Sequence, residues 1–195
     1  MRVNRLQTEF NIKLQIRHFP LHPETPAEGL SLAALFAGRN IDLEAVQIEM
    51  QQRMAQEGLP YGNRTMTFNS RLAQELAKWA EQEPGGEGIH NALYLAYFVD
   101  NINLADINSL VDVATRLGLS GGDARDALNT GRFGDAVDAD WDRSRALGIT
   151  SVPTFVTGNR GLVGAHSYEE LVALLESSGA TPRTPPASST GSSQP

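Results

Sequence analysis

Cysteine is absent from the 195 residues of this chain. Its absence excludes disulfide bonds, thiol nucleophiles and cysteine metal sites within these residues, and it leaves the redox compartment undetermined. Long apolar runs are absent too, since none approaches the roughly 20 residues that a helix needs to cross a bilayer. The first residues, Met-Arg-Val-Asn-Arg-Leu-Gln, hold no apolar stretch like that of a secretory signal. We therefore expect a cytoplasmic location and no contact with a membrane.

Positive charge is scarce in this sequence. It holds 16 basic and 23 acidic residues, which give a net charge of −7 at pH 7. That balance argues against a surface that binds nucleic acid or anionic lipid. Apolar residues make up 41% of the chain, which is enough for a sizeable core. The length fits one domain, or one domain with an insertion.

Motifs for metals and cofactors are also missing. The histidines are scattered and lack the spacing of metal ligands: His18, His22, His90 and His166. Three carboxylates lie at helical spacing from Asp135 to Asp142, but nearby arginines favour a solvated, ion-paired helix face. No glycine-rich stretch continues into Lys-Ser or Lys-Thr, as a phosphate loop would. We expect neither a cofactor nor a metal site.

Two periodic patterns open the chain. Val3, Leu6 and Phe10 fall at helical spacing, with no Ser, Thr or Asp cap before them. This is either a helix that begins in its middle or a short frayed helix at the chain end, and the sequence leaves both open. Residues 11–19, Asn-Ile-Lys-Leu-Gln-Ile-Arg-His-Phe, alternate strictly between apolar and polar. That alternation predicts a β-strand.

Helical patterns fill the sequence from about Gly29 to Leu147. Asn69, Asp106 and Ser120 can each cap a helix, because a short polar side chain there can accept hydrogen bonds from the first turn. Three further helices are predicted from apolar residues at helical spacing, around Leu43–Met54, Ile89–Tyr97 and Phe133–Trp141.

Within residues 148–156, Gly-Ile-Thr-Ser-Val-Pro-Thr-Phe-Val, a proline lies at the start of a predicted apolar strand. Proline cannot donate a hydrogen bond inside a sheet, and an X-Pro linkage is where a cis peptide bond costs little. A cis Val152–Pro153 bond would leave the main chain of Ser151 and Val152 facing outward. That arrangement suits a surface that receives an extended peptide. The alternative is that Pro153 serves only as a turn residue.

The remaining sequence predicts a hairpin and a final helix. Phe155 and Val156 begin the first strand, residues 157–161 form the turn, and residues 162–165 form the return strand. Ser167, followed three residues later by Glu170, predicts a capping box at the start of the helix. From Gly179 onward the chain is rich in Pro, Ser and Thr, which predicts a disordered tail.

Several of these stretches resemble a known family. Thr-Ser-Val-Pro-Thr-Phe-Val resembles the cis-proline strand of thioredoxin-fold proteins. The flanking Arg-Ala-Leu-Gly-Ile and Thr-Gly-Asn-Arg-Gly-Leu-Val-Gly-Ala-His are similar to DsbA-like proteins of the FrnE branch, relatives of 2-hydroxychromene-2-carboxylate isomerase. The resemblance runs from about Phe10 to Leu175. It implies an α/β, thioredoxin-like fold with a large helical insertion.

The resemblance divides the chain into four parts. Residues 1–28 would hold a partial first helix and a strand, and residues 29–147 would be the helical insertion. Residues 148–178 would hold the cis-proline hairpin and the C-terminal helix, with a disordered tail at residues 179–195. In this reading the fold is incomplete at its N-terminal side, because the family's first strand and the start of its first helix have no counterpart.

The family implies thiol–disulfide exchange by a Cys-x-x-Cys that faces the cis-proline loop. This chain has the loop and no cysteine, so we expect no redox turnover from it. Related glutathione-dependent isomerases use a serine near the same helix start, and no serine precedes Ser31 here. Two origins fit these observations. In the first, translation is assigned to start at an internal methionine, and a strand and a Cys-x-x-Cys are encoded upstream. In the second, the chain is a cysteine-free relative that binds peptides or glutathione, or has a structural role, without redox turnover.

The resemblance also assigns residues to substrate binding. Ser151, Val152 and Pro153 would accept an extended peptide, or a small thiol such as glutathione, through main-chain hydrogen bonds. His22 lies near the position of the family's active-site mouth and is added to them, although a polar surface histidine is the commoner role. A homodimer through an exposed sheet edge is a further expectation.

Overall fold

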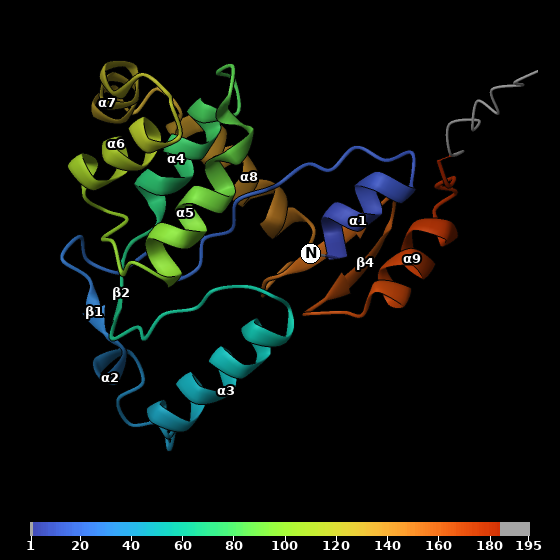
Figure 1. Ribbon diagram of the computed structural model, residues 1–195, viewed down its shortest axis with the longest axis horizontal. Coiled ribbons are helices and arrows are strands. Elements are labelled where there is room, and N and C mark those ends of the chain that lie inside the picture. The colour runs from blue at the N-terminus through green and yellow to red at the C-terminus, as the bar shows by residue number, and fades with distance from the viewer. Residues whose placement is uncertain (1, 184–195) are drawn as a thin grey trace, which may run out of the picture. The chain divides into compact units, whose positions relative to one another are not determined.

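The computed structural model describes residues 2–183 (Figure 1). The chain forms two compact units: one joins Met1–Ile16 to Ser151–Pro195, and the other is Arg17–Thr150. We call the first the hairpin unit and the second the helical unit. Among the described residues no helix has the length and apolar character needed to cross a membrane.

Helices dominate the helical unit. In chain order they are α2 (Leu32–Leu35), α3 (Leu43–Gln56), α4 (Arg71–Ala80), the 3₁₀ helix η1 (Gly86–Gly88), α5 (Ile89–Phe98), α6 (Ile107–Arg116), α7 (Gly121–Thr130) and α8 (Gly134–Ala146). A small antiparallel sheet pairs β1 (Leu30–Ser31) with β2 (Met66–Thr67). The sequence did not predict this sheet or α2, since two-residue strands carry no alternation.

Helix starts follow the predicted capping residues closely. Asp106 accepts a hydrogen bond from the Ser109 amide at 2.9 Å, and Ser120 accepts one from Asp123. At α4 the cap differs by one residue, because Ser70 occupies the N-cap position. The side-chain oxygen Oδ1 of Asn69 still accepts from the Arg71 amide at 2.9 Å.

Helix α4 supplies much of the core of the helical unit. It packs against α5, α6, α7 and α8. Leu76 and Trp79 of α4, Ile89 of α5 and Leu110 of α6 are almost entirely buried. Burying each such side chain contributes about 1.5–3 kcal/mol, so the helical unit has a core of its own.

The hairpin unit combines α1 (Arg2–Glu9), β3 (Thr154–Thr157), β4 (Arg160–Val163) and α9 (Tyr168–Ser177). Leu6, Phe10 and Leu171 form its small buried core. Strands β3 and β4 pair antiparallel, with Thr154 opposite Val163. The return strand therefore begins at Arg160, two residues earlier than predicted, because the turn is tight and Gly158 takes a φ of 56°.

The predicted strand at residues 11–19 is wrong. No strand is assigned there, and the nearest pairing is an isolated bridge between Phe10 and Pro182. A strand needs a neighbouring chain to accept its hydrogen bonds, and alternation alone does not supply one. The side chains of Leu14 and Ile16 are accordingly exposed, at 40% and 42%.

The predicted start of disorder at Gly179 is also wrong for residues 179–183. Ala180 packs against the core of the hairpin unit. Asn11 donates from its main chain to Thr181, and the Arg183 side chain donates to the Phe10 carbonyl at 3.0 Å. These bonds fix the segment against α1. The rest of the predicted tail lies outside the described residues.

Candidate functional site

The residues assigned to substrate binding in the hairpin unit form an exposed loop before β3. The peptide bond between Val152 and Pro153 is cis. The ends of the loop are fixed: the Thr154 hydroxyl donates to the Ser151 carbonyl at 2.7 Å, and the Gly164 amide donates to the Pro153 carbonyl at 2.7 Å. The fixed ends hold Val152 at the surface, where its side chain is 46% exposed.

Val152 keeps both of its main-chain groups available. Neither its N–H nor its C=O forms a hydrogen bond with another described residue. An exposed donor and acceptor on one residue are the groups that an extended peptide pairs with when it adds alongside a chain. Ser151 beside it is exposed as well. Chemically the loop can therefore bind a main chain, and it offers no nucleophile stronger than a serine hydroxyl.

His22 belongs to the helical unit rather than to the loop. Its φ of 52° is in the left-handed region, and its carbonyl accepts from the Thr25 amide at 3.1 Å. The ring lies 3.7 Å from the Glu24 carboxylate and is 43% exposed. Ser151, Val152 and Pro153 are thus consecutive residues of one exposed loop in the hairpin unit, and His22 is a turn residue of the helical unit with an acidic neighbour.

Sequence reasoning missed a buried carboxylate in the helical unit. Asp140 of α8 is only 2% exposed at its side chain. It accepts from Lys78 Nζ at 2.6 Å, from Arg17 Nη1 at 2.8 Å and from the His18 main-chain amide at 3.0 Å. Burial alone would raise the pKa of Asp140, but these hydrogen bonds hold it below its usual value. The carboxylate ties the segment at Arg17 to α4 and α8.

His18 is neutral as a result of the same surroundings. The pKa of His18 is lowered to about 4, chiefly by burial and also by the nearby Lys78 and His90, which together outweigh the opposing effect of Asp140. Its ring centre lies 6.0 Å from that of His90, which in turn contacts Glu81 at 2.9 Å. The two imidazoles help to line a pocket of about 250 Å³ with Tyr94, Tyr97 and Phe98 of α5.

One signal in the sequence could have revealed Asp140. Val137, Asp140 and Ser144 are the buried residues of α8, and they continue the helical spacing of its apolar face. A carboxylate at a core position of an amphipathic helix needs buried partners. The aspartates singled out by their spacing behave differently: Asp138 pairs with Arg71 at the surface, and Asp142 with Arg145. Among the described residues, no cluster of His, Asp or Glu could hold a metal ion.

Comparison with known proteins agrees with this architecture. A profile described as the DSBA-like thioredoxin domain matches residues 1–176. The chain belongs to the DsbA-like thioredoxin domain family. The sequence-based recognition and the predicted thioredoxin-like α/β fold are therefore confirmed.

Individual relatives of this DsbA-like chain differ in how much they share with it. The uncharacterized protein YwbO of Bacillus subtilis is 30% identical over 95 residues, which is 48% of this chain and 48% of YwbO. The chain thus spans about half the length of this curated relative. A probable DsbA oxidoreductase from Streptomyces coelicolor is 28% identical with a TM-score of 0.76, covering 87% of this chain and 76% of that structure.

A second solved structure supports the fold alone. It is a 2-hydroxychromene-2-carboxylate isomerase, 20% identical, with a TM-score of 0.57. The match covers 70% of this DsbA-like chain and 66% of the isomerase. The fold of this chain is therefore similar to that of a named oxidoreductase and of a named isomerase.

Proposed function

We propose that this DsbA-like protein binds an extended peptide, or a peptide-like small thiol such as glutathione, at the loop Ser151–Val152–Pro153. The observation that carries the proposal is Val152, which is 46% exposed and whose N–H and C=O have no hydrogen-bond partner among the described residues. A bound peptide would donate to that carbonyl and accept from that amide, as in strand addition. Family membership supports the same location.

Redox turnover is not part of the proposed activity. Thiol–disulfide exchange proceeds by attack of a thiolate on a disulfide, and the attacking residue must cycle between two oxidation states. These 195 residues contain no cysteine, and a serine or histidine cannot replace the sulfur. Any exchange at this loop would need both thiols from outside the 195 residues.

A second candidate is thiol–disulfide oxidoreductase activity by a longer form of the protein. The match to the family profile and the likeness to a DsbA oxidoreductase favour it. In that case the loop would present a substrate to a Cys-x-x-Cys contributed by another segment. Reading the gene upstream of Met1 separates the two candidates: an in-frame strand and Cys-x-x-Cys favour the second, and a nearby in-frame stop removes it.

The binding proposal is tested by titrating the ¹⁵N-labelled protein with two cysteine-free probes, an extended peptide and S-methylglutathione. We expect the Ser151, Val152 and Thr154 amide resonances to move with at least one probe. In parallel, insulin reduction with dithiothreitol should proceed no faster than without the protein, whereas a cysteine-containing thioredoxin accelerates it. Unmoved loop resonances at saturating probe would overturn the binding proposal, and measurable turnover would overturn the claim of redox inactivity.

A further inference from the structure

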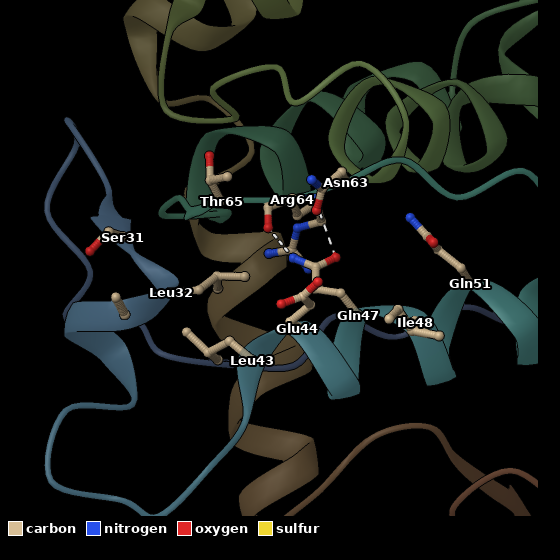
Figure 2. A pocket seen from close by; sticks show the side chains of 11 residues that line it. Ser31, Leu32, Leu43, Glu44, Gln47, Ile48, Gln51, Asn63, Arg64 and Thr65 are labelled. Atoms are coloured by element: carbon tan, nitrogen blue, oxygen red, sulfur yellow. Dashed lines mark hydrogen bonds between the residues drawn. The ribbon is translucent and has the colours of Figure 1, made fainter.

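A pocket of about 550 Å³ lies in the helical unit, and neither the Ser151–Pro153 loop nor Asp140 and its partners line it (Figure 2). Its walls are α2, the N-terminal half of α3 and the extended segment Asn63–Thr65 that leads into β2. This volume falls within the range of about 300–1,000 Å³ that is usual for small-molecule sites. Leu32, Leu43 and Ile48 give it apolar surface, and Ile48 remains 48% exposed.

Gln47 holds the two sides of this pocket together. Figure 2 shows its amide facing the main chain of Arg64, donating to the Arg64 carbonyl and accepting from the Arg64 amide. On the far side Gly62 donates to the Phe98 carbonyl at 2.8 Å. A Cβ at Gly62 would lie 2.6 Å from the Val99 carbonyl oxygen, so only glycine permits this approach. The segment that carries Arg64 is therefore fixed from both sides.

Arg64 is a half-buried cation without a counter-charge. Its guanidinium lies 4.1 Å from the centre of the Tyr97 ring and 5.0 Å from that of Phe98. Nη2 donates to the Met66 carbonyl at 3.2 Å and to the Tyr97 hydroxyl. Nη1 makes no hydrogen bond with a described residue, and Nε is buried without a partner there.

The other shielded cations of the helical unit behave differently. Arg71 is paired with Glu75 and Asp138, and Lys78 is paired with Asp140. None of the ion pairs among the described residues includes Arg64. A desolvated charge is normally paired, because leaving it uncompensated is costly. Arg64 thus stands out as a cation whose natural partner is an anion from outside the chain.

We propose that this pocket binds a small molecule with a carboxylate on an apolar body. The carboxylate pairs with Arg64 and the body covers Leu32, Leu43 and Ile48. A carboxylate suits a guanidinium better than a neutral oxygen does, because charge-assisted hydrogen bonds are about twice as strong. The proposal does not depend on peptide binding at Val152, since none of the pocket residues belongs to that loop.

The test is a titration of the ¹⁵N-labelled protein with octanoate, octanamide and octylamine, followed at the Arg64 Nε resonance and by calorimetry. Octanoate should bind and shift that resonance, and octanamide should bind roughly tenfold more weakly. Equal binding of octanoate and octanamide, tighter binding of octylamine, or an unmoved Arg64 resonance would overturn the proposal.

Variants separate the pocket from the general fold. Ala33→Phe adds a large side chain at the pocket wall and leaves Arg64 intact, so it should abolish octanoate binding. Arg64→Gln should abolish octanoate binding as well. If that variant fails to fold, Arg64→Lys takes its place and should retain part of the binding. Glu49, an exposed carboxylate of α3 outside the pocket lining, is the matched control. Glu49→Gln should leave octanoate binding unchanged, whereas loss of binding in that variant would contradict the proposal.

Discussion

A few side chains attach the first residues of the helical unit, at Arg17 and His18, to its helices. The buried carboxylate of Asp140 accepts hydrogen bonds from Lys78, from Arg17 and from the His18 amide. Such a group contributes little net stability when complete, yet removing one charge leaves the others buried and unpaired. Asp140 is therefore a residue whose loss costs far more than a typical surface ion pair.

Replacing Asp140 with asparagine should lower the free energy of unfolding by about 3–5 kcal/mol, because the buried Lys78 loses its 2.6 Å partner and keeps only the Glu81 carboxylate at 4.0 Å. Urea unfolding followed by tryptophan fluorescence measures the change. Asp138→Asn is the matched control on the same helix. Its side chain is 56% exposed, so that variant should unfold close to wild type. Equal effects of the two substitutions would refute the assigned role of Asp140.

His18 gives the helical unit a predictable response to acid. Its pKa is lowered from 6.5 to about 4 in the folded protein, so the unfolded chain binds the proton more readily. Stability is therefore fully present above about pH 6.5 and falls as the pH drops towards 4. The loss from this residue is about 3 kcal/mol. Urea midpoints measured from pH 7 to pH 4 should fall less steeply in His18→Gln than in wild type.

The exposed His22 supplies the control for that pH series. His22→Gln should keep the wild-type slope, because the ring is 43% exposed and its contact at 3.7 Å is with the exposed carboxylate of Glu24. If His18→Gln also kept the wild-type slope, burial of a neutral His18 would be refuted.

At the scale of elements, helices were more predictable than strands. Asp106, Ser120 and Ser167 cap helices as their side-chain chemistry indicated, and Ser167 with Glu170 completes the capping box of α9. Caps act within one turn, so a local sequence is enough to identify them. The alternation at residues 11–19 was equally regular and produced no strand, because pairing depends on a distant chain.

Substitutions in the first segment test this distinction. Phe10 is 4% exposed within the core of the hairpin unit, so Phe10→Ala should cost about 3–5 kcal/mol. Leu14→Ala should change the free energy of unfolding by less than about 0.5 kcal/mol, because that side chain lies largely in solvent. Protection of the α9 amides from hydrogen exchange measures the change in free energy of unfolding in each of the two variants. A large loss in Leu14→Ala would show that residues 11–19 pack as the sequence suggested.

The candidate sites were predictable to different degrees. The loop at Val152 was recognisable because Pro153 at a strand mouth is a local signal. Asp140 and Arg64 were not identified, since their importance depends on which side chains surround them after folding. Arg64 and Tyr97 are far apart in the sequence, and no spacing rule predicts their contact. Only the folded structure shows that Arg64 has no carboxylate partner among the described residues.

The whole molecule consists of two units with unequal cores. The helical unit buries a large apolar cluster around α4, whereas Leu6, Phe10 and Leu171 are the buried members of the hairpin cluster. A two-stranded sheet with so small a core is marginal in water. The hairpin unit should therefore be the less stable of the two.

Unfolding in urea should reveal this difference. Trp79 and Trp141 both belong to the helical unit, so tryptophan fluorescence reports on that unit. The amide resonances of β3, β4 and α9 report on the hairpin unit. We expect the amide resonances to be lost at a lower urea concentration than the fluorescence change. Coincident transitions would show a single cooperative molecule instead.

The most direct test of the central claim compares peptide affinity in two variants of one residue. Val152→Ala keeps the main-chain donor and acceptor, and Val152→Pro removes the N–H. If the loop binds through its main chain, Val152→Ala should bind an extended cysteine-free peptide nearly as well as wild type. Val152→Pro, checked for folding by its β3 and β4 resonances, should bind roughly tenfold more weakly. Equal affinity in wild type and Val152→Pro would contradict main-chain recognition at this loop.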